Sequence, residues 1–114
     1  MAKPRTKKEK LALFEAWLRQ NFPTPYPVVY QYRRLEGSGE DRVWGDTCRV
    51  GRKLYITVDP RMTLGDSLAI LIHEYPHAMV WRHETIERHR VHHDAEWGIA
   101  YAKVYSAWHD TEET

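Results

Sequence analysis

The order of hydrophobic and polar residues predicts a helix near the start of the chain. Between Lys7 and Asn21 apolar side chains recur at helical spacing, and Pro23 follows as a stop signal. The apolar positions are Leu11, Leu13, Phe14, Trp17 and Leu18. We therefore expect an amphipathic helix whose apolar side packs on the core.

Three short segments in the middle of the chain have the composition of strands. Residues 28–33, about 43–50 and 54–58 are rich in β-branched and aromatic side chains. Gly51-Arg52-Lys53 marks a tight turn between the last two segments. We expect a small three-stranded antiparallel sheet whose last strand ends at Asp59-Pro60.

Two further helices are expected in the second half of the chain. Thr63 is suited to cap a helix that begins near Met62. An apolar stripe continues along this helix through Leu64, Leu68, Leu71 and Ile72. Residues 82–92 are dense in charge and histidine, which is typical of a loop. Residues 94–108 again have helical spacing, with Trp97, Tyr101, Val104 and Trp108 as the apolar positions.

Size and composition agree with a single folded domain. The chain has 114 residues, of which 42% are hydrophobic and 29% are charged, and this balance is far from that of a disordered protein. We expect one α+β domain over residues 1–114, with flexible ends at 1–6 and 110–114. A net charge of +1 argues against binding to nucleic acid by bulk electrostatics.

Cysteine content and hydropathy bear on the compartment. Cys48 is the only cysteine, so the chain forms neither an internal disulfide nor a cysteine-based zinc cluster. No run of 18 apolar residues occurs, and no apolar signal segment follows the basic N-terminus. We therefore expect a cytoplasmic protein that is neither exported nor inserted into a membrane.

The chemistry of the chain centres on His73-Glu74-Tyr75-Pro76-His77, an HExxH motif. Residues four apart project from one face of a helix, so His73 and His77 can bind the same ion. In such a motif the ion is Zn²⁺, which activates a water, and Glu74 is the general base that accepts the proton. Pro76 lies inside the expected helix, where it removes a hydrogen bond, and we expect a local kink.

A catalytic zinc needs a third protein ligand and an open position for water. The candidates downstream of the motif are His83, His89, His92, His93 and Glu96. His93 and Glu96 are three residues apart near the start of the last helix, where they share one face. We favour His93 and keep Glu96 as the alternative.

The segments HEYPHAMVW and HDAEW together resemble the SprT-like, or Spartan-like, metallopeptidase domain. The resemblance extends over most of the chain, and it implies a zincin-like fold with the third ligand at His93. Asp94 replaces the glycine that usually follows this histidine, and Trp97 is the aromatic residue of the motif. The cysteine-rich ribbon of many relatives has no counterpart here, so the chain is similar to minimal phage or prophage members.

The resemblance implies a zinc-dependent metallopeptidase that acts on a protein or peptide substrate. DNA enters as a partner by family analogy alone, and the oligomeric state stays open. In zincins an extended peptide can pair with a strand beside the metal, which here is 54–58 or its neighbour. Two alternatives remain: an inactive or structural-zinc module that binds protein or DNA, and a metal hydrolase that acts on another bond.

Overall fold

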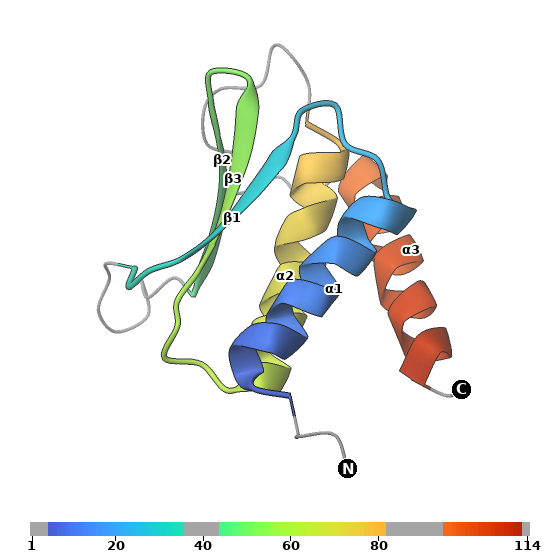
Figure 1. The fold of residues 1–114 in the computed structure, drawn as a ribbon. Coiled ribbons are helices and arrows are strands. Elements are labelled where there is room, and N and C mark those ends of the chain that lie inside the picture. The colour runs from blue at the N-terminus through green and yellow to red at the C-terminus, as the bar shows by residue number, and fades with distance from the viewer. Residues whose placement is uncertain (1–4, 36–43, 82–94, 113–114) are drawn as a thin grey trace.

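The computed structural model describes residues 5–35, 44–81 and 95–112. In these residues three helices pack with a three-stranded sheet, which confirms the predicted α+β class. The helices are α1 (Lys7–Asn21), α2 (Leu64–Met79) and α3 (Ala95–Glu112), and the strands are β1 (Val28–Tyr32), β2 (Gly45–Val50) and β3 (Lys53–Val58). Helix α2 is central, because it contacts the sheet, α1 and α3 (Figure 1).

The sheet is mixed, so the prediction of an antiparallel sheet is wrong for one of its two pairings. The strand order is β1-β3-β2, with β2 antiparallel to β3 and β1 parallel to it. The turn at Gly51, where φ is +61°, produces the antiparallel pair. Strand β3 is the most buried strand, and Leu54, Ile56 and Val58 are at most 1% exposed. The central position of β3 covers its apolar side chains, because a strand lies on each side of it.

Helix α1 begins and packs largely as its sequence predicts. The Thr6 hydroxyl caps it by accepting a hydrogen bond from the Glu9 amide at 3.1 Å. Leu11, Phe14 and Leu18 are buried at intervals of three and four residues. Leu13 is 52% exposed, so its predicted place in the apolar face is wrong. Adjacent residues lie about 100° apart around a helix, and only Phe14 of this pair reaches the core.

The core lies between the sheet and the helices and includes a cluster of aromatic rings. Phe14, Trp17 and Trp108 pack with centroid separations of 4.6 to 5.5 Å, which joins α1 to α3. Tyr75 on α2 is 1% exposed, and its hydroxyl donates to the Phe22 carbonyl at 2.7 Å. The hydroxyl of a buried tyrosine needs such a partner, and this one fixes α2 against the end of α1.

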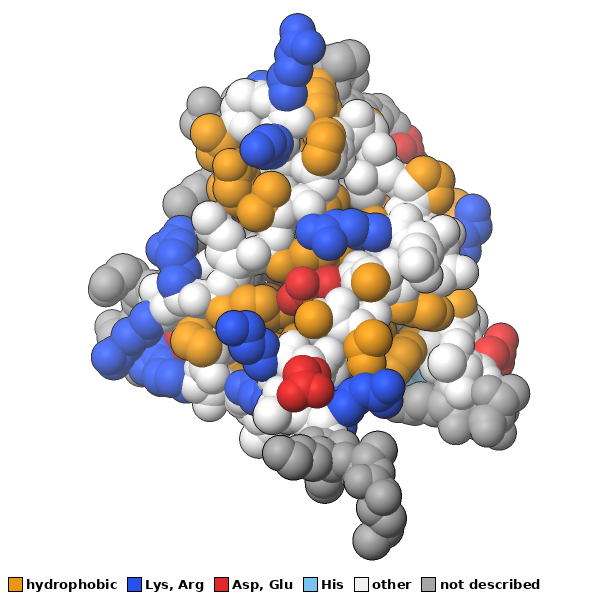
Figure 2. Space-filling model, in the orientation of Figure 1, with side chains coloured by type: hydrophobic (Ala, Val, Ile, Leu, Met, Phe, Trp, Pro, Cys, Tyr) orange, Lys and Arg blue, Asp and Glu red, His pale blue; other side chains and the backbone are white. Residues whose placement is uncertain are grey.

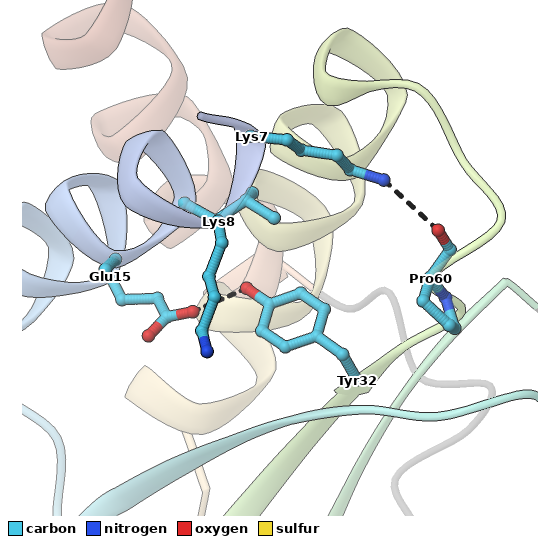
Figure 3. Close-up of a pocket in the computed structure, with 7 residues that line it drawn as sticks. Lys7, Lys8, Glu15, Tyr32 and Pro60 are labelled. Atoms are coloured by element: carbon cyan, nitrogen blue, oxygen red, sulfur yellow. Dashed lines mark hydrogen bonds between the residues drawn. The ribbon is translucent and has the colours of Figure 1, made fainter. Parts of the chain in front are cut away.

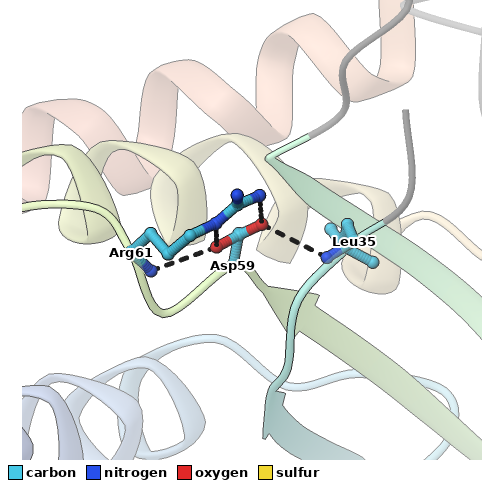
Figure 4. A network of polar contacts seen from close by, with 3 residues as sticks. All are labelled: Leu35, Asp59 and Arg61. Carbon is cyan, nitrogen blue, oxygen red and sulfur yellow. Dashed lines mark hydrogen bonds and ion pairs between the residues drawn. The ribbon is translucent and has the colours of Figure 1, made fainter. Parts of the chain in front are cut away.

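The buried carboxylate of Asp59, just after β3, binds residues from the segment after β1 and from the link to α2 (Figure 4). Asp59 accepts two hydrogen bonds from the Arg61 guanidinium, at 2.9 and 2.7 Å, and one from the Leu35 amide at 3.2 Å. Its own amide donates to the Trp44 carbonyl at 2.9 Å. The Arg61 hydrogen bonds hold the pKa of Asp59 well below its usual range, although burial acts in the opposite direction.

Helices α2 and α3 carry the candidate site. Thr63 caps α2 through a 3.2 Å hydrogen bond from the Asp66 amide, as predicted. The helix continues past Pro76 to Met79, and the expected kink stays a prediction. Helix α3 continues to Glu112, beyond the predicted end at Trp108. Within the described residues, no helix is long and apolar enough to cross a membrane.

Candidate metal centre

His73 and His77 project from the same face of α2, one turn apart. Their ring centroids are 5.6 Å apart. The side chain of His73 is 40% exposed, whereas His77 is 2% exposed. A solute can therefore reach the pair at His73, while His77 is fixed by the surrounding protein.

Glu74 lies on the side of α2 that faces β2. The Thr47 hydroxyl donates to Glu74 Oε1 at 2.7 Å and lies 3.2 Å from the Glu74 carbonyl oxygen. The second carboxylate oxygen, Oε2, is 4.0 Å from His73 Nε2. Burial raises the pKa of Glu74 to about 7, the Thr47 hydrogen bond opposes this shift, and the Asp46 carboxylate adds to it. The carboxylate is thus buried and oriented beside the first histidine.

Gly45 permits the close approach of β2 to α2. A Cβ atom at this position would lie 2.4 Å from Ile70 Cγ2 and 3.2 Å from Glu74 Cγ. Thr47 follows two residues later on the same face of the strand. The sequence pattern did not reveal either residue as part of the site, because their contacts with α2 are between segments far apart in the chain. The alternation of side-chain directions along a strand shows only that Gly45 and Thr47 lie on the same face of β2.

Trp97 covers the histidines from the α3 side. Its ring centroid is 5.1 Å from that of His73 and 5.5 Å from that of His77. The indole N–H donates to the His73 carbonyl at 3.3 Å. Tyr101 stacks behind it at 5.0 Å. Trp97 therefore restricts the orientation of both imidazoles and excludes water from one side of the pair.

The third metal ligand is not placed by the described residues. His93, together with His83, His89 and His92, lies outside the ranges that the structure describes. Glu96 is exposed in the first turn of α3 and lines a cavity of about 560 Å³ with Met79 and Val80, among others. Within the described ranges, no three His, Cys, Asp or Glu side chains gather closely enough to hold one ion. The choice between His93 and Glu96 stays a prediction.

The two described histidines are compatible with zinc. Imidazoles bound to one tetrahedral zinc ion, through Zn–N bonds of about 2 Å, place their ring centroids about 5 Å apart. The observed 5.6 Å is close to this separation. Nitrogen donors are also the ligands that Zn²⁺ prefers alongside thiolate and carboxylate. His73 and His77 thus supply two of the ligands that such an ion needs.

A second cavity lies on the α1 side of the molecule (Figure 3). It has a volume of about 480 Å³, and its lining residues are Lys7, Lys8, Leu11, Ala12, Glu15, Tyr32 and Pro60. Tyr32 donates to the Glu15 carboxylate at 2.5 Å at its edge. Neither histidine of the motif lines it. On the face shown in Figure 2, Lys and Arg side chains are scattered among apolar and acidic ones.

Comparisons with known proteins neither support nor oppose the resemblance found in the motif. No family model matches the chain, no curated protein matches it, and no solved structure matches it. Membership in the SprT-like family therefore stays a prediction from the residues of the two motif segments.

Proposed function

We propose that this protein is a zinc-dependent metallopeptidase with a zincin-like fold, in which His73 and His77 hold the metal and Glu74 is the general base. One observation carries this proposal. The His73 and His77 rings lie on one face of α2 with their centroids 5.6 Å apart, and the buried carboxylate of Glu74 lies 4.0 Å from His73 Nε2. Catalytic groups need this combination of rigid support and access from solvent.

Bound zinc would polarise the peptide carbonyl and lower the pKa of a water to about 7. Glu74 then accepts the proton of the attacking water and delivers it to the leaving amine. Burial raises the pKa of Glu74 to about 7 in the metal-free protein, and bound zinc would act in the opposite direction, toward the ionised form that a general base needs. Trp97 keeps water away from one side of the histidines while His73 remains open to substrate.

The substrate binds in this proposal as an extended peptide along β2. Strand β3 is paired on both sides, whereas β2 has one paired side among the described residues. Strand β2 also passes directly beside Glu74. A peptide that adds to this edge by main-chain hydrogen bonds brings its carbonyl groups close to the base. We therefore assign β2, a neighbour of the strand at 54–58, as the strand that pairs with the substrate peptide.

The third ligand in this proposal is His93, as the SprT-like resemblance implies, with Glu96 as the alternative. The protein acts in a reducing compartment such as the cytoplasm in this proposal, because Cys48 is its single cysteine and forms no internal disulfide. DNA as a partner rests on family analogy alone.

Zinc analysis of the purified protein tests the metal site. We expect one zinc per chain in the wild type, loss of zinc in His73→Ala and His93→Ala, and retention in Glu96→Ala. His109→Ala is the matched control, because the His109 ring packs against that of Tyr105 near the far end of α3. Retention in His93→Ala with loss in Glu96→Ala would instead assign the third ligand to Glu96.

Peptidase activity tests the reaction. We expect zinc-loaded wild type to cleave an unfolded protein substrate, and Glu74→Gln to bind zinc but lose turnover. Ester and phosphoester substrates, assayed in parallel, distinguish a peptidase from another hydrolase. A wild type that binds zinc through four protein ligands and cleaves none of these substrates has a structural metal, and the proposal is then wrong.

A further inference from the structure

Thr47 is the polar side chain that fixes the orientation of Glu74 in the described structure. It lies on β2 and is 2% exposed. Its hydroxyl is 2.7 Å from Glu74 Oε1 and 3.2 Å from the Glu74 carbonyl oxygen. A hydroxyl has one hydrogen to donate, and the shorter distance and the charge of the acceptor favour the carboxylate. The threonine thus acts mainly on the catalytic group and not on the helix backbone.

The packing around Thr47 makes this contact rigid. A β-branched side chain in a strand has few χ1 rotamers, and full burial restricts them further. Gly45, two residues earlier, brings β2 so close to α2 that even a methyl group there would overlap Ile70. The strand and the helix that carry the two partners of the hydrogen bond are therefore held close together.

The two carboxylate oxygens consequently have different surroundings. Thr47 occupies Oε1, whereas Oε2 faces His73 Nε2 at 4.0 Å. A general base must present a lone pair toward the reacting water, and the water must lie on the histidine side of Glu74 if His73 binds the metal. Oε1 is bound to Thr47 on β2, and Oε2, although it also lies 3.5 Å from the place of a Cβ atom at Gly45, has no hydrogen bond to Thr47.

We infer that Thr47 is a positioning residue, which holds Oε1 so that Oε2 is the oxygen that accepts and returns the proton. The inference rests on the proposed function for the proton transfer, but the orientation of the carboxylate is a property of the metal-free protein. The contacts of the Thr47 hydroxyl in this arrangement are with Glu74. Its effect on the reaction acts through Glu74.

Substitution of Thr47 with a matched control tests the inference. Thr47→Val keeps the shape and removes the hydroxyl, and Thr47→Ser keeps the hydroxyl and removes a methyl group. Thr57→Val is the control, because Thr57 is also 2% exposed in the same sheet but its hydroxyl bonds Gln31 at 3.2 Å. All three keep both histidines, so each should bind one zinc per chain.

The expected kinetic result is a loss in kcat that Thr47→Ser restores. A misplaced catalytic group lowers kcat by about tenfold to 100-fold, while KM changes by no more than about twofold because peptide binding along β2 is retained. Thr57→Val should keep wild-type kcat. Equal losses in Thr47→Val and Thr57→Val, or an equal loss in Thr47→Ser, would overturn the inference.

Crystal structures of the metal-free variants provide a readout that needs no activity. We expect the Glu74 carboxylate to keep its orientation in Thr47→Ser and to rotate in Thr47→Val. An unchanged carboxylate in Thr47→Val overturns the inference even if the protein is an active peptidase. If the wild type is inactive but the carboxylate rotates in Thr47→Val as expected, the proposed function is refuted and the positioning by Thr47 is retained. Thr47→Ala takes the place of Thr47→Val if the latter does not fold.

Discussion

Glu74→Gln should stabilise the metal-free protein at pH 8 far more than at pH 5. Burial raises the pKa of Glu74 in the folded protein to about 7, from an ordinary value of 4.5. Because the pKa of Glu74 is higher in the folded than in the unfolded protein, folding is more favourable when its carboxyl group is protonated. The stability that this group contributes is thus fully present below about pH 4.5 and is lost as the pH rises through about 7.

The magnitude follows from the two pKa values. At 1.36 kcal/mol for each pH unit, the difference between about 7 and 4.5 is about 3 kcal/mol in the free energy of unfolding. Most of it is lost between pH 5 and pH 8. Glutamine carries no charge at either pH, and its side-chain oxygen still accepts the Thr47 hydrogen bond. The variant therefore lacks this part of the pH dependence.

Urea unfolding of EDTA-treated protein, followed by tryptophan fluorescence at pH 5 and pH 8, measures the effect. Glu9→Gln is the control, because Glu9 lies exposed in the first turn of α1 and surface substitutions change stability by about 0.5 kcal/mol or less. If the stability difference between Glu74→Gln and wild type is the same at both pH values, Glu74 is not buried as the structure describes.

Three further predictions concern the surroundings of the site. Gly45→Ala should destabilise the protein by about 1 to 3 kcal/mol in urea unfolding, because its Cβ overlaps α2. Gly65→Ala, in open space on α2, should instead be neutral or stabilising by up to about 1 kcal/mol. Trp97→Ala should weaken zinc binding by about tenfold to 100-fold in a chelator competition, because the imidazoles lose their support; equal affinity would contradict this. Asp59→Asn should reduce stability at pH 7 but not at strongly acidic pH, because the lowered pKa of Asp59 makes its contribution disappear as the pH falls; a deficit that persists in acid would show a loss of packing instead.

The helices were the best predicted part of the fold, because their signals are local. The spacing of Leu11, Phe14 and Leu18 and the cap at Thr63 depend on residues within one or two turns. The strand segments were also located to within one or two residues where the structure describes them. Their order was not predicted, since alternation within a strand does not indicate which strand lies beside it.

The candidate site was predicted only in the part that lies on one helix. His73, Glu74 and His77 are four residues apart at most, so the helical repeat alone brings them together. Thr47 and Gly45 reach the same site from β2, more than 25 residues earlier in the chain, as the separation of 27 residues between Thr47 and Glu74 shows. A contact of this kind depends on how the sheet packs on the helix, which no local pattern encodes.

The Asp59 carboxylate also bears on the order of folding. The carboxylate binds Leu35, after β1, and Arg61, in the link to α2, while the Asp59 amide donates to the Trp44 carbonyl just before β2. The Leu35 amide is 24 residues away in sequence. Contacts between distant segments form only after the intervening loops have closed, so this network belongs to the late, slow part of folding. Once formed, it joins the segments beside both outer strands to the link that leads into α2. We therefore expect the rate of unfolding, and with it the lifetime of the folded site, to depend on an ion pair outside the candidate metal centre.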